Sequence, residues 1–142
     1  KWAGLAGLRI GYAVMHEKLA SALNAIQQPY TITNYAMQAA IISLDNTSFL
    51  ESNIKNIKDT REKFIQQLVD INSITALPSE GNFVLLRLNK GTNTEFYKYM
   101  YDKKILIRSY SDDILSKYVR ISIGTPDDMN QVASAIGEWD KQ

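Results

Sequence analysis

The chain has 142 residues, of which 45% are hydrophobic and 22% are charged, and its formal net charge at pH 7 is +1. This composition excludes a disordered tail and the marked basic excess of a nucleic-acid-binding domain. The lack of cysteine excludes disulfides and thiolate metal sites, and a single histidine, His16, argues against a histidine-based metal site or a catalytic triad. The sequence has no apolar run near the roughly 20 residues of a membrane helix and no visible signal peptide, so we expect a soluble, cytoplasmic α/β chain.

The first half of the chain predicts one strand and three helices. Residues 8–15 (LRIGYAVM) are apolar almost throughout and predict a short buried strand. Residues 16–26 carry apolar side chains at helical spacing, and His16 is expected to start this helix rather than to act in catalysis. A second helix is expected over residues 34–44 with Asn34 as its N-cap, and a longer amphipathic helix over residues 48–71.

The second half predicts two strands, a helix, two more strands and a final helix. The expected strands are residues 74–77, 82–88, 105–109 and 118–123, and the helix between them is residues 94–103. The last helix should begin at Thr125, because a proline at the first helical position and acidic residues in the first turn follow this capping residue. This half can close into a small α+β unit. The single strand at residues 8–15 cannot form such a unit, because the first half of the chain offers it no other strand to pair with. This predicts further protein before Lys1.

The segment KWAGLAGLRIGY at residues 1–12 carries the most specific pattern. Glycines three residues apart, taken alone, predict a tight loop that feeds a strand, and their spacing matches neither the dinucleotide fingerprint nor the P-loop. The longer string resembles the cofactor-lysine segment of pyridoxal-phosphate-dependent aminotransferases of fold type I, most closely the histidinol-phosphate aminotransferase branch. The stretches QQPYTITNYAMQAA, LPSEGNFVLLRL, ILIRSY and YVRISIGTPDDM resemble further motifs of that branch, so the resemblance covers essentially the whole chain.

The resemblance implies an α/β fold that is the C-terminal part of fold type I. Residues 1–47 would then be the tail of a large cofactor-binding domain. Residues 48–142 would form an α+β small domain with a mainly antiparallel sheet, joined to the large domain by the long helix at 48–71.

The same resemblance assigns a role to two residues of the first segment. Lys1 matches the lysine that forms a Schiff base with pyridoxal 5′-phosphate, and Arg9 matches the arginine that holds the cofactor phosphate. Both residue types suit these tasks. A lysine amine can form an imine and then shuttle a proton as a base, and a guanidinium offers a fork of donors to a phosphate.

Arg108 and Arg120 each place one charge inside an otherwise apolar strand. Burying an unpaired guanidinium is costly, so each needs an anion, a structural partner or a solvated face. The resemblance implies that Arg120 binds the acidic group of the substrate and that Arg108 is a second arginine at a substrate phosphate. Asn82 follows a turn and precedes a strand, where it serves either the backbone geometry or the lining of the site.

The implied reaction is amino transfer between histidinol phosphate and 2-oxoglutarate or glutamate in histidine biosynthesis. The implied protein is a cytoplasmic homodimer with no metal, nucleic-acid or membrane partner. Because the residues that bind the cofactor ring in this family precede the lysine, the 142-residue chain alone is expected to be inactive. A threonine-phosphate decarboxylase or an aromatic aminotransferase of the same fold is an alternative. A non-catalytic α+β module that binds anions is an alternative of another class.

Overall fold

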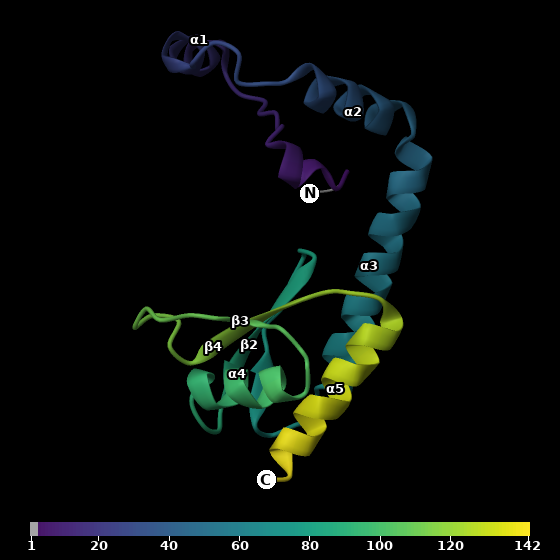
Figure 1. Ribbon diagram of the computed structural model, residues 1–142, viewed down its shortest axis with the longest axis vertical. Coiled ribbons are helices and arrows are strands. Elements are labelled where there is room, and N and C mark those ends of the chain that lie inside the picture. Colours follow the sequence, from purple (N-terminus) through teal and green to yellow (C-terminus); the bar gives the residue numbers. More distant parts are fainter. Residues whose placement is uncertain (1–2) are drawn as a thin grey trace. The chain divides into compact units, whose positions relative to one another are not determined.

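The computed structural model describes residues 3–142 and divides the chain into two compact units, Lys1–Ile54 and Lys55–Gln142. The boundary between them falls within the longest helix of the described residues, Thr47–Gln67. The elements in chain order are η1 (Leu5–Leu8), α1 (Glu17–Ile26), α2 (Asn34–Asp45), α3 (Thr47–Gln67), β1 (Ile74–Ala76), β2 (Phe83–Leu88), α4 (Asn93–Asp102), β3 (Arg108–Ser109), β4 (Tyr118–Ser122) and α5 (Pro126–Asp140) (Figure 1).

The second unit is built on one sheet with the strand order β1-β2-β4-β3. All of its pairings are antiparallel. The central pair, β2 and β4, is not consecutive in the chain, because α4 and β3 lie between them in sequence. The expected order of two strands, a helix, two strands and a helix is therefore confirmed, as is the mainly antiparallel sheet.

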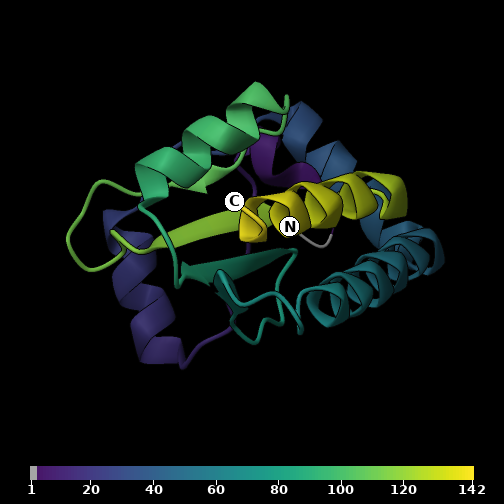
Figure 2. The ribbon, with the colours of Figure 1, turned by 90° about the horizontal axis from the view of Figure 1, so that it is seen from below.

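One face of this sheet carries the hydrophobic core. Along β2 the alternate residues Val84, Leu86 and Leu88 are buried, and the register places Ile121 and Val119 of β4 opposite the first two. Helices α4 and α5 lie side by side against the sheet (Figure 2). The helical segments contribute Phe64, Leu68, Phe96, Met100, Met129, Val132, Ala135 and Ile136. Each large side chain buried in this way stabilises the fold by about 1.5–3 kcal/mol, so this face holds the unit together.

The expected strand at residues 8–15 is wrong. Leu5–Leu8 forms a short 3-10 helix, and residues 10–16 have no regular structure. Tyr12 and Val14 are 82% and 92% exposed. A strand needs a neighbour to which its backbone can hydrogen-bond, and within the described part of the chain every strand lies at residue 74 or beyond. The expectation that this segment is buried is wrong for the same reason, because its residues are exposed or only partly buried.

Two helix ends differ from expectation for local reasons. The N-cap of α2 is Thr33, whose Oγ1 accepts a hydrogen bond from the Ala36 amide at 3.2 Å, so Asn34 is the first helical residue rather than the cap. Helix α3 ends at Gln67 and not at Ile71. The chain then continues in turns, with the Leu68 and Ile71 amides bonded to carbonyl groups three residues back, and both side chains still pack in or against the core.

The third strand is also shorter than expected, because only Arg108–Ser109 pairs with β4. The Ile105 amide bonds instead to the carbonyl of Met100 in α4, which removes the start of this segment from the ladder. The starts of α1 and α5 agree with expectation. His16 caps α1 by accepting from the Lys18 amide, and Thr125 caps α5.

Candidate functional site

The first candidate segment lies at the start of the chain, and Lys1 is outside the described residues. Arg9 follows η1 in the left-handed region, with φ of 56°, and its amide bonds to the carbonyl of Ala6 at 3.2 Å. Its side chain is exposed and makes no hydrogen bond or ion pair with any residue in the range 3–142. The guanidinium is therefore available to bind an anion.

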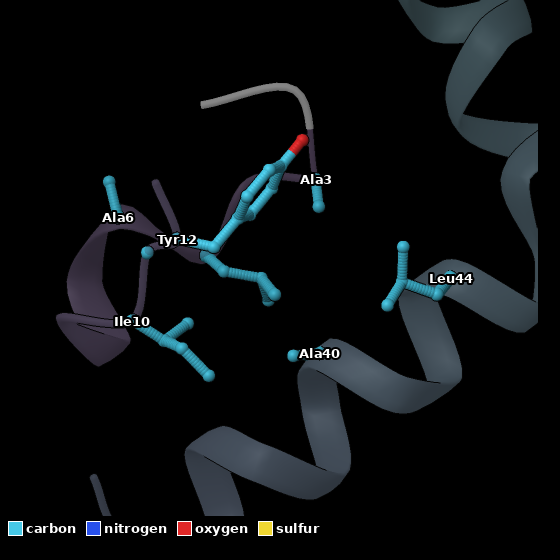
Figure 3. A pocket seen from close by; sticks show the side chains of 8 residues that line it. Ala3, Ala6, Ile10, Tyr12, Ala40 and Leu44 are labelled. Atoms are coloured by element: carbon cyan, nitrogen blue, oxygen red, sulfur yellow. The ribbon is translucent and has the colours of Figure 1, made fainter. Parts of the chain in front are cut away.

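An apolar pocket of about 470 Å³ lies beside this segment in the first unit (Figure 3). Its lining residues are Ala3, Leu5, Ala6, Ile10, Gly11, Tyr12, Ala40 and Leu44. The Tyr12 hydroxyl is the only polar side-chain group in this set, and Arg9 does not belong to it. The pocket thus suits an apolar group rather than a phosphate.

Arg108 and Arg120 are brought together by the sheet. They are direct partners in the β3–β4 ladder, so they lie on the same face, and Arg120 also faces Leu85 of β2. This face is opposite the one that carries the core. Side chains directly opposite in an antiparallel pair have Cβ atoms about 4.5–5.5 Å apart, and like charges there are destabilising. The pair is therefore unfavourable unless an anion or another group compensates it.

Each of the two guanidinium groups lies near an aromatic ring. The Arg120 Cζ is 5.3 Å from the centre of the Phe83 ring, and the Arg108 Cζ is 5.9 Å from the centre of the Tyr110 ring. Such cation–π contacts contribute about 0.5–1 kcal/mol at exposed sites. Phe83 was not expected as a site residue, because a phenylalanine at the start of a strand reads as core. Only the register shows that it shares a face with Arg120.

The Arg120 side chain carries an unsatisfied donor. Its Nε is buried and has no hydrogen-bond partner, and among the described residues neither Arg108 nor Arg120 is in an ion pair with a carboxylate. A buried polar atom without a partner costs about 1–3 kcal/mol and calls for an explanation. Two guanidinium groups on one face, one of them with an unused buried donor, form the arrangement that a multiply charged anion would satisfy.

Arg108 also lines an open, polar pocket of about 580 Å³. The other lining residues are Asn93, Thr94, Ser109, Tyr110, Ser111, Asp112 and Ser116, and Arg120 is not among them. The hydroxyl and amide groups of this pocket can donate hydrogen bonds to an oxyanion. The negative charge of Asp112, however, would repel an oxyanion bound close to it.

Asn82 lies one residue before β2. Its carbonyl accepts a hydrogen bond from the Ile123 amide at 2.9 Å, which extends the β2–β4 ladder by one step. This register position belongs to the face of Val84 rather than that of Arg120. The Asn82 side chain is exposed and forms no hydrogen bond within residues 3–142. The structure therefore brings the two arginines together but not Asn82, whose role in lining the site stays a prediction.

The described residues contain neither a membrane-spanning helix nor a cluster of metal-ligating side chains. No helix among them is long and apolar enough to cross a membrane. No group of three or more His, Cys, Asp or Glu side chains in residues 3–142 could hold a metal ion.

Comparisons with known proteins add independent information. Residues 1–136 match the family model described as aminotransferase class I and II. Histidinol-phosphate aminotransferase from Citrifermentans bemidjiense is 34% identical over 134 residues, which is 94% of this chain and 38% of that protein. The chain thus spans little more than a third of the length of this curated relative.

Solved structures agree with this match. The histidinol-phosphate aminotransferase from Clostridium acetobutylicum superposes with a TM-score of 0.88 at 27% identity, over 99% of this chain and 43% of that chain. The histidinol-phosphate aminotransferase from Sinorhizobium meliloti, solved in complex with pyridoxal-5′-phosphate, gives a TM-score of 0.80 at 27% identity. That alignment covers 99% of this chain and 39% of the other.

Proposed function

Because the chain belongs to the class I and II aminotransferase family, we propose that it is the C-terminal part of an aminotransferase that acts on histidinol phosphate and 2-oxoglutarate. Amino transfer converts 2-oxoglutarate to glutamate and histidinol phosphate to the corresponding ketone. The reaction is reversible, and in the direction that consumes glutamate it forms histidinol phosphate for histidine biosynthesis. The similarity to histidinol-phosphate aminotransferases supports this proposal.

One observation carries the choice of a phosphorylated substrate. Arg108 and Arg120 share a face of the sheet, and the buried Nε of Arg120 has no hydrogen-bond partner. Guanidinium groups bind phosphate oxygens with parallel N–H donors, and two of them balance a doubly charged phosphate better than a single carboxylate. In the proposed enzyme both arginines bind the phosphate of the substrate and so orient its amine.

The cofactor proposal rests on the first segment. Arg9 fits a phosphate, since its guanidinium is exposed and has no partner in the described part of the chain. When bound, pyridoxal phosphate supplies an electron sink for chemistry at the substrate α-carbon. Arg9 would bind the cofactor phosphate. Lys1 would attach the cofactor through its amine and carry the substrate proton on Nζ, which requires that neighbouring groups disfavour its charged form.

We propose that the complete protein has two domains and forms a dimer. Residues 1–47 would belong to a large cofactor-binding domain and residues 48–142 to the small domain, with α3 connecting them. The complete protein would be a cytoplasmic homodimer. The 142-residue chain alone would be inactive, because it covers only part of the length of its relatives.

A substrate panel tests the reaction. The complete protein that contains this chain is assayed with histidinol phosphate, phenylalanine and threonine phosphate, each with 2-oxoglutarate, and carbon dioxide release is recorded in parallel. We expect kcat/KM for histidinol phosphate to exceed that for the other two by roughly tenfold or more, since only this substrate combines the phosphate with the imidazole side chain. Faster decarboxylation of threonine phosphate would overturn the proposal in favour of a decarboxylase. No turnover of any substrate would favour a non-catalytic anion-binding module.

A further inference from the structure

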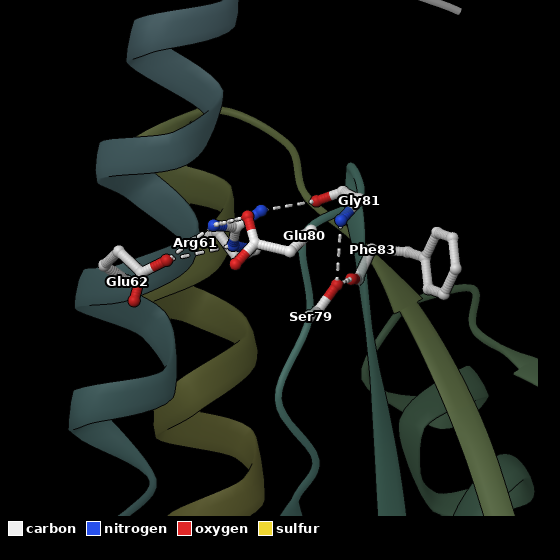
Figure 4. A network of polar contacts seen from close by, with 6 residues as sticks. All are labelled: Arg61, Glu62, Ser79, Glu80, Gly81 and Phe83. Carbon is white, nitrogen blue, oxygen red and sulfur yellow. Dashed lines mark hydrogen bonds and ion pairs between the residues drawn. The ribbon is translucent and has the colours of Figure 1, made fainter.

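The second unit contains a buried arginine that no part of the proposed function uses. Arg61 lies on α3 and is only 4% exposed. Its Nη1 donates a hydrogen bond to the carbonyl of Gly81 at 3.1 Å, across 20 residues of sequence (Figure 4). Its Nε and Nη2 donate to Glu62 at 3.1 and 2.6 Å, and Glu80 lies 3.8 Å away.

The bond to Gly81 is the part of this network that specifies structure. The side chains of Glu62 and Glu80 are 63% and 95% exposed, and exposed ion pairs contribute about 0–1 kcal/mol. A buried guanidinium, in contrast, is costly unless its donors are satisfied. The loop at residues 78–82 is therefore fixed to α3 through the Gly81 carbonyl. Without this hydrogen bond, Nη1 of the buried Arg61 would lack an acceptor, which is unfavourable.

The same loop contacts the aromatic ring of Phe83, which lies next to the Arg120 guanidinium. Gly81 lies so close to Phe83 that a Cβ added to the glycine would be 3.1 Å from Cε1 of the ring. Ser79 closes the same turn, since its Oγ accepts from the Gly81 amide and donates to the Phe83 carbonyl (Figure 4). The Phe83 ring in turn faces the Arg120 guanidinium at 5.3 Å.

We propose that Arg61 is a positioning residue for recognition of the substrate phosphate. It fixes Gly81, Gly81 confines the Phe83 ring, and the ring sets the orientation of the Arg120 guanidinium. This inference rests on the proposed function in one respect, namely that Arg120 binds the phosphate. Helix α3 would then contribute to substrate specificity through Arg61, in addition to packing against the core.

The test compares a phosphorylated substrate with the same molecule lacking the phosphate. In the complete protein, kcat/KM is measured for histidinol phosphate and for histidinol, and their ratio is the readout. We expect Arg61→Met to lower this ratio roughly tenfold through a higher KM for histidinol phosphate, with kcat nearly unchanged. A purely structural role would reduce the amount of active enzyme and leave both the ratio and KM unaltered. Arg61→Lys, which keeps the charge but not the fork of donors, should lower the ratio as well.

Two further variants complete the design. Gly81→Ala leaves Arg61 in place, but the added methyl group would displace the Phe83 ring. This variant should therefore lower the ratio too. It keeps the inference testable if the Arg61 variants fail to fold. Lys55→Gln removes a cation from the exposed side of the same helix and should leave the ratio unchanged. If Arg120→Lys lowers the ratio while the Arg61 and Gly81 variants keep the wild-type value, the positioning role is refuted. If the wild type itself shows no preference for the phosphate, the proposed function fails first.

Discussion

Arg120 illustrates how one residue can be unfavourable for folding and still suit a site. Its buried Nε lacks a hydrogen-bond partner, and Arg108 is directly opposite it in the ladder. Both features destabilise the folded chain when no anion is bound. A residue of this kind is expected where function, rather than stability, determines the side chain.

This view predicts a gain of stability on removal of the charge. In the 142-residue chain, Arg120→Leu should raise the free energy of unfolding by about 1 kcal/mol, because an apolar side chain leaves no donor unsatisfied. Urea unfolding followed by circular dichroism measures the change. Arg87→Leu is the matched control, since Arg87 lies on the same face but is exposed, and it should change little. A loss of stability in Arg120→Leu would contradict this account.

At the scale of single residues, the sequence predicted the need for a partner at Arg108 and Arg120 but not their pairing. A single charged side chain in an apolar strand requires an anion, a structural partner or exposure to solvent, because burying an unpaired charge is costly. The identity of the residue opposite depends on register, which arises from contacts far apart in sequence. Arg61 could not be found at all, because an arginine among polar residues of a helix is expected to be solvated. Its burial depends on the loop at residues 78–82, which folds back on α3.

At the scale of elements, α5 shows how side chains at a helix start determine its stability. Thr125 Oγ1 accepts from the Asp128 amide at 3.2 Å, while the Asp128 carboxylate accepts from the hydroxyl and the amide of Thr125 at 2.7 and 2.9 Å. Both bonds favour the charged carboxylate and so lower the pKa of Asp128 below its usual range. The hydrogen bond from the Thr125 hydroxyl has the larger effect, and that from the Thr125 amide the smaller. The sequence predicted this start correctly because all the residues involved are neighbours.

The lowered pKa gives a pH dependence with a definite sign. A carboxyl whose pKa is lower in the folded chain stabilises it above the unfolded pKa, and this contribution is lost as the pH falls through the folded value. Asp128→Asn removes this contribution. The wild type should therefore be more stable than the variant at about pH 7, and the difference should shrink towards about pH 3. Urea unfolding at both pH values measures it. Thr125→Ala should weaken the same dependence, and a difference that does not vary with pH would refute the assignment.

The elements that were predicted poorly are those whose structure depends on distant partners. Residues 8–15 have the composition of a strand, yet no neighbouring strand is available to them in the described part of the chain. β3 shortens because Ile105 is bonded to the end of α4. Local signals such as the capping residues His16 and Thr125 were sufficient for helix starts, whereas strand pairing was not encoded locally.

At the scale of the whole molecule, the two units differ in how completely they are packed. The second unit has a contiguous core that joins the sheet to three helices. In the described part of the first unit, only Ala36 is buried. Apolar side chains of α1 and α2 such as Leu23, Ile26 and Ile42 are exposed. The second unit therefore has the internal contacts of a domain. The division at Ile54 lies seven residues after the proposed end of the large domain at residue 47, so that domain boundary stays a prediction.

The proposed function requires Lys1 to be the lysine that binds pyridoxal phosphate covalently. The most direct test is borohydride reduction of the complete protein after incubation with pyridoxal phosphate, followed by mass spectrometry of its peptides. The account predicts a phosphopyridoxyl group on Lys1, and none after substitution of Lys1→Ala. Attachment to a different lysine, or no attachment at all, would contradict the claim.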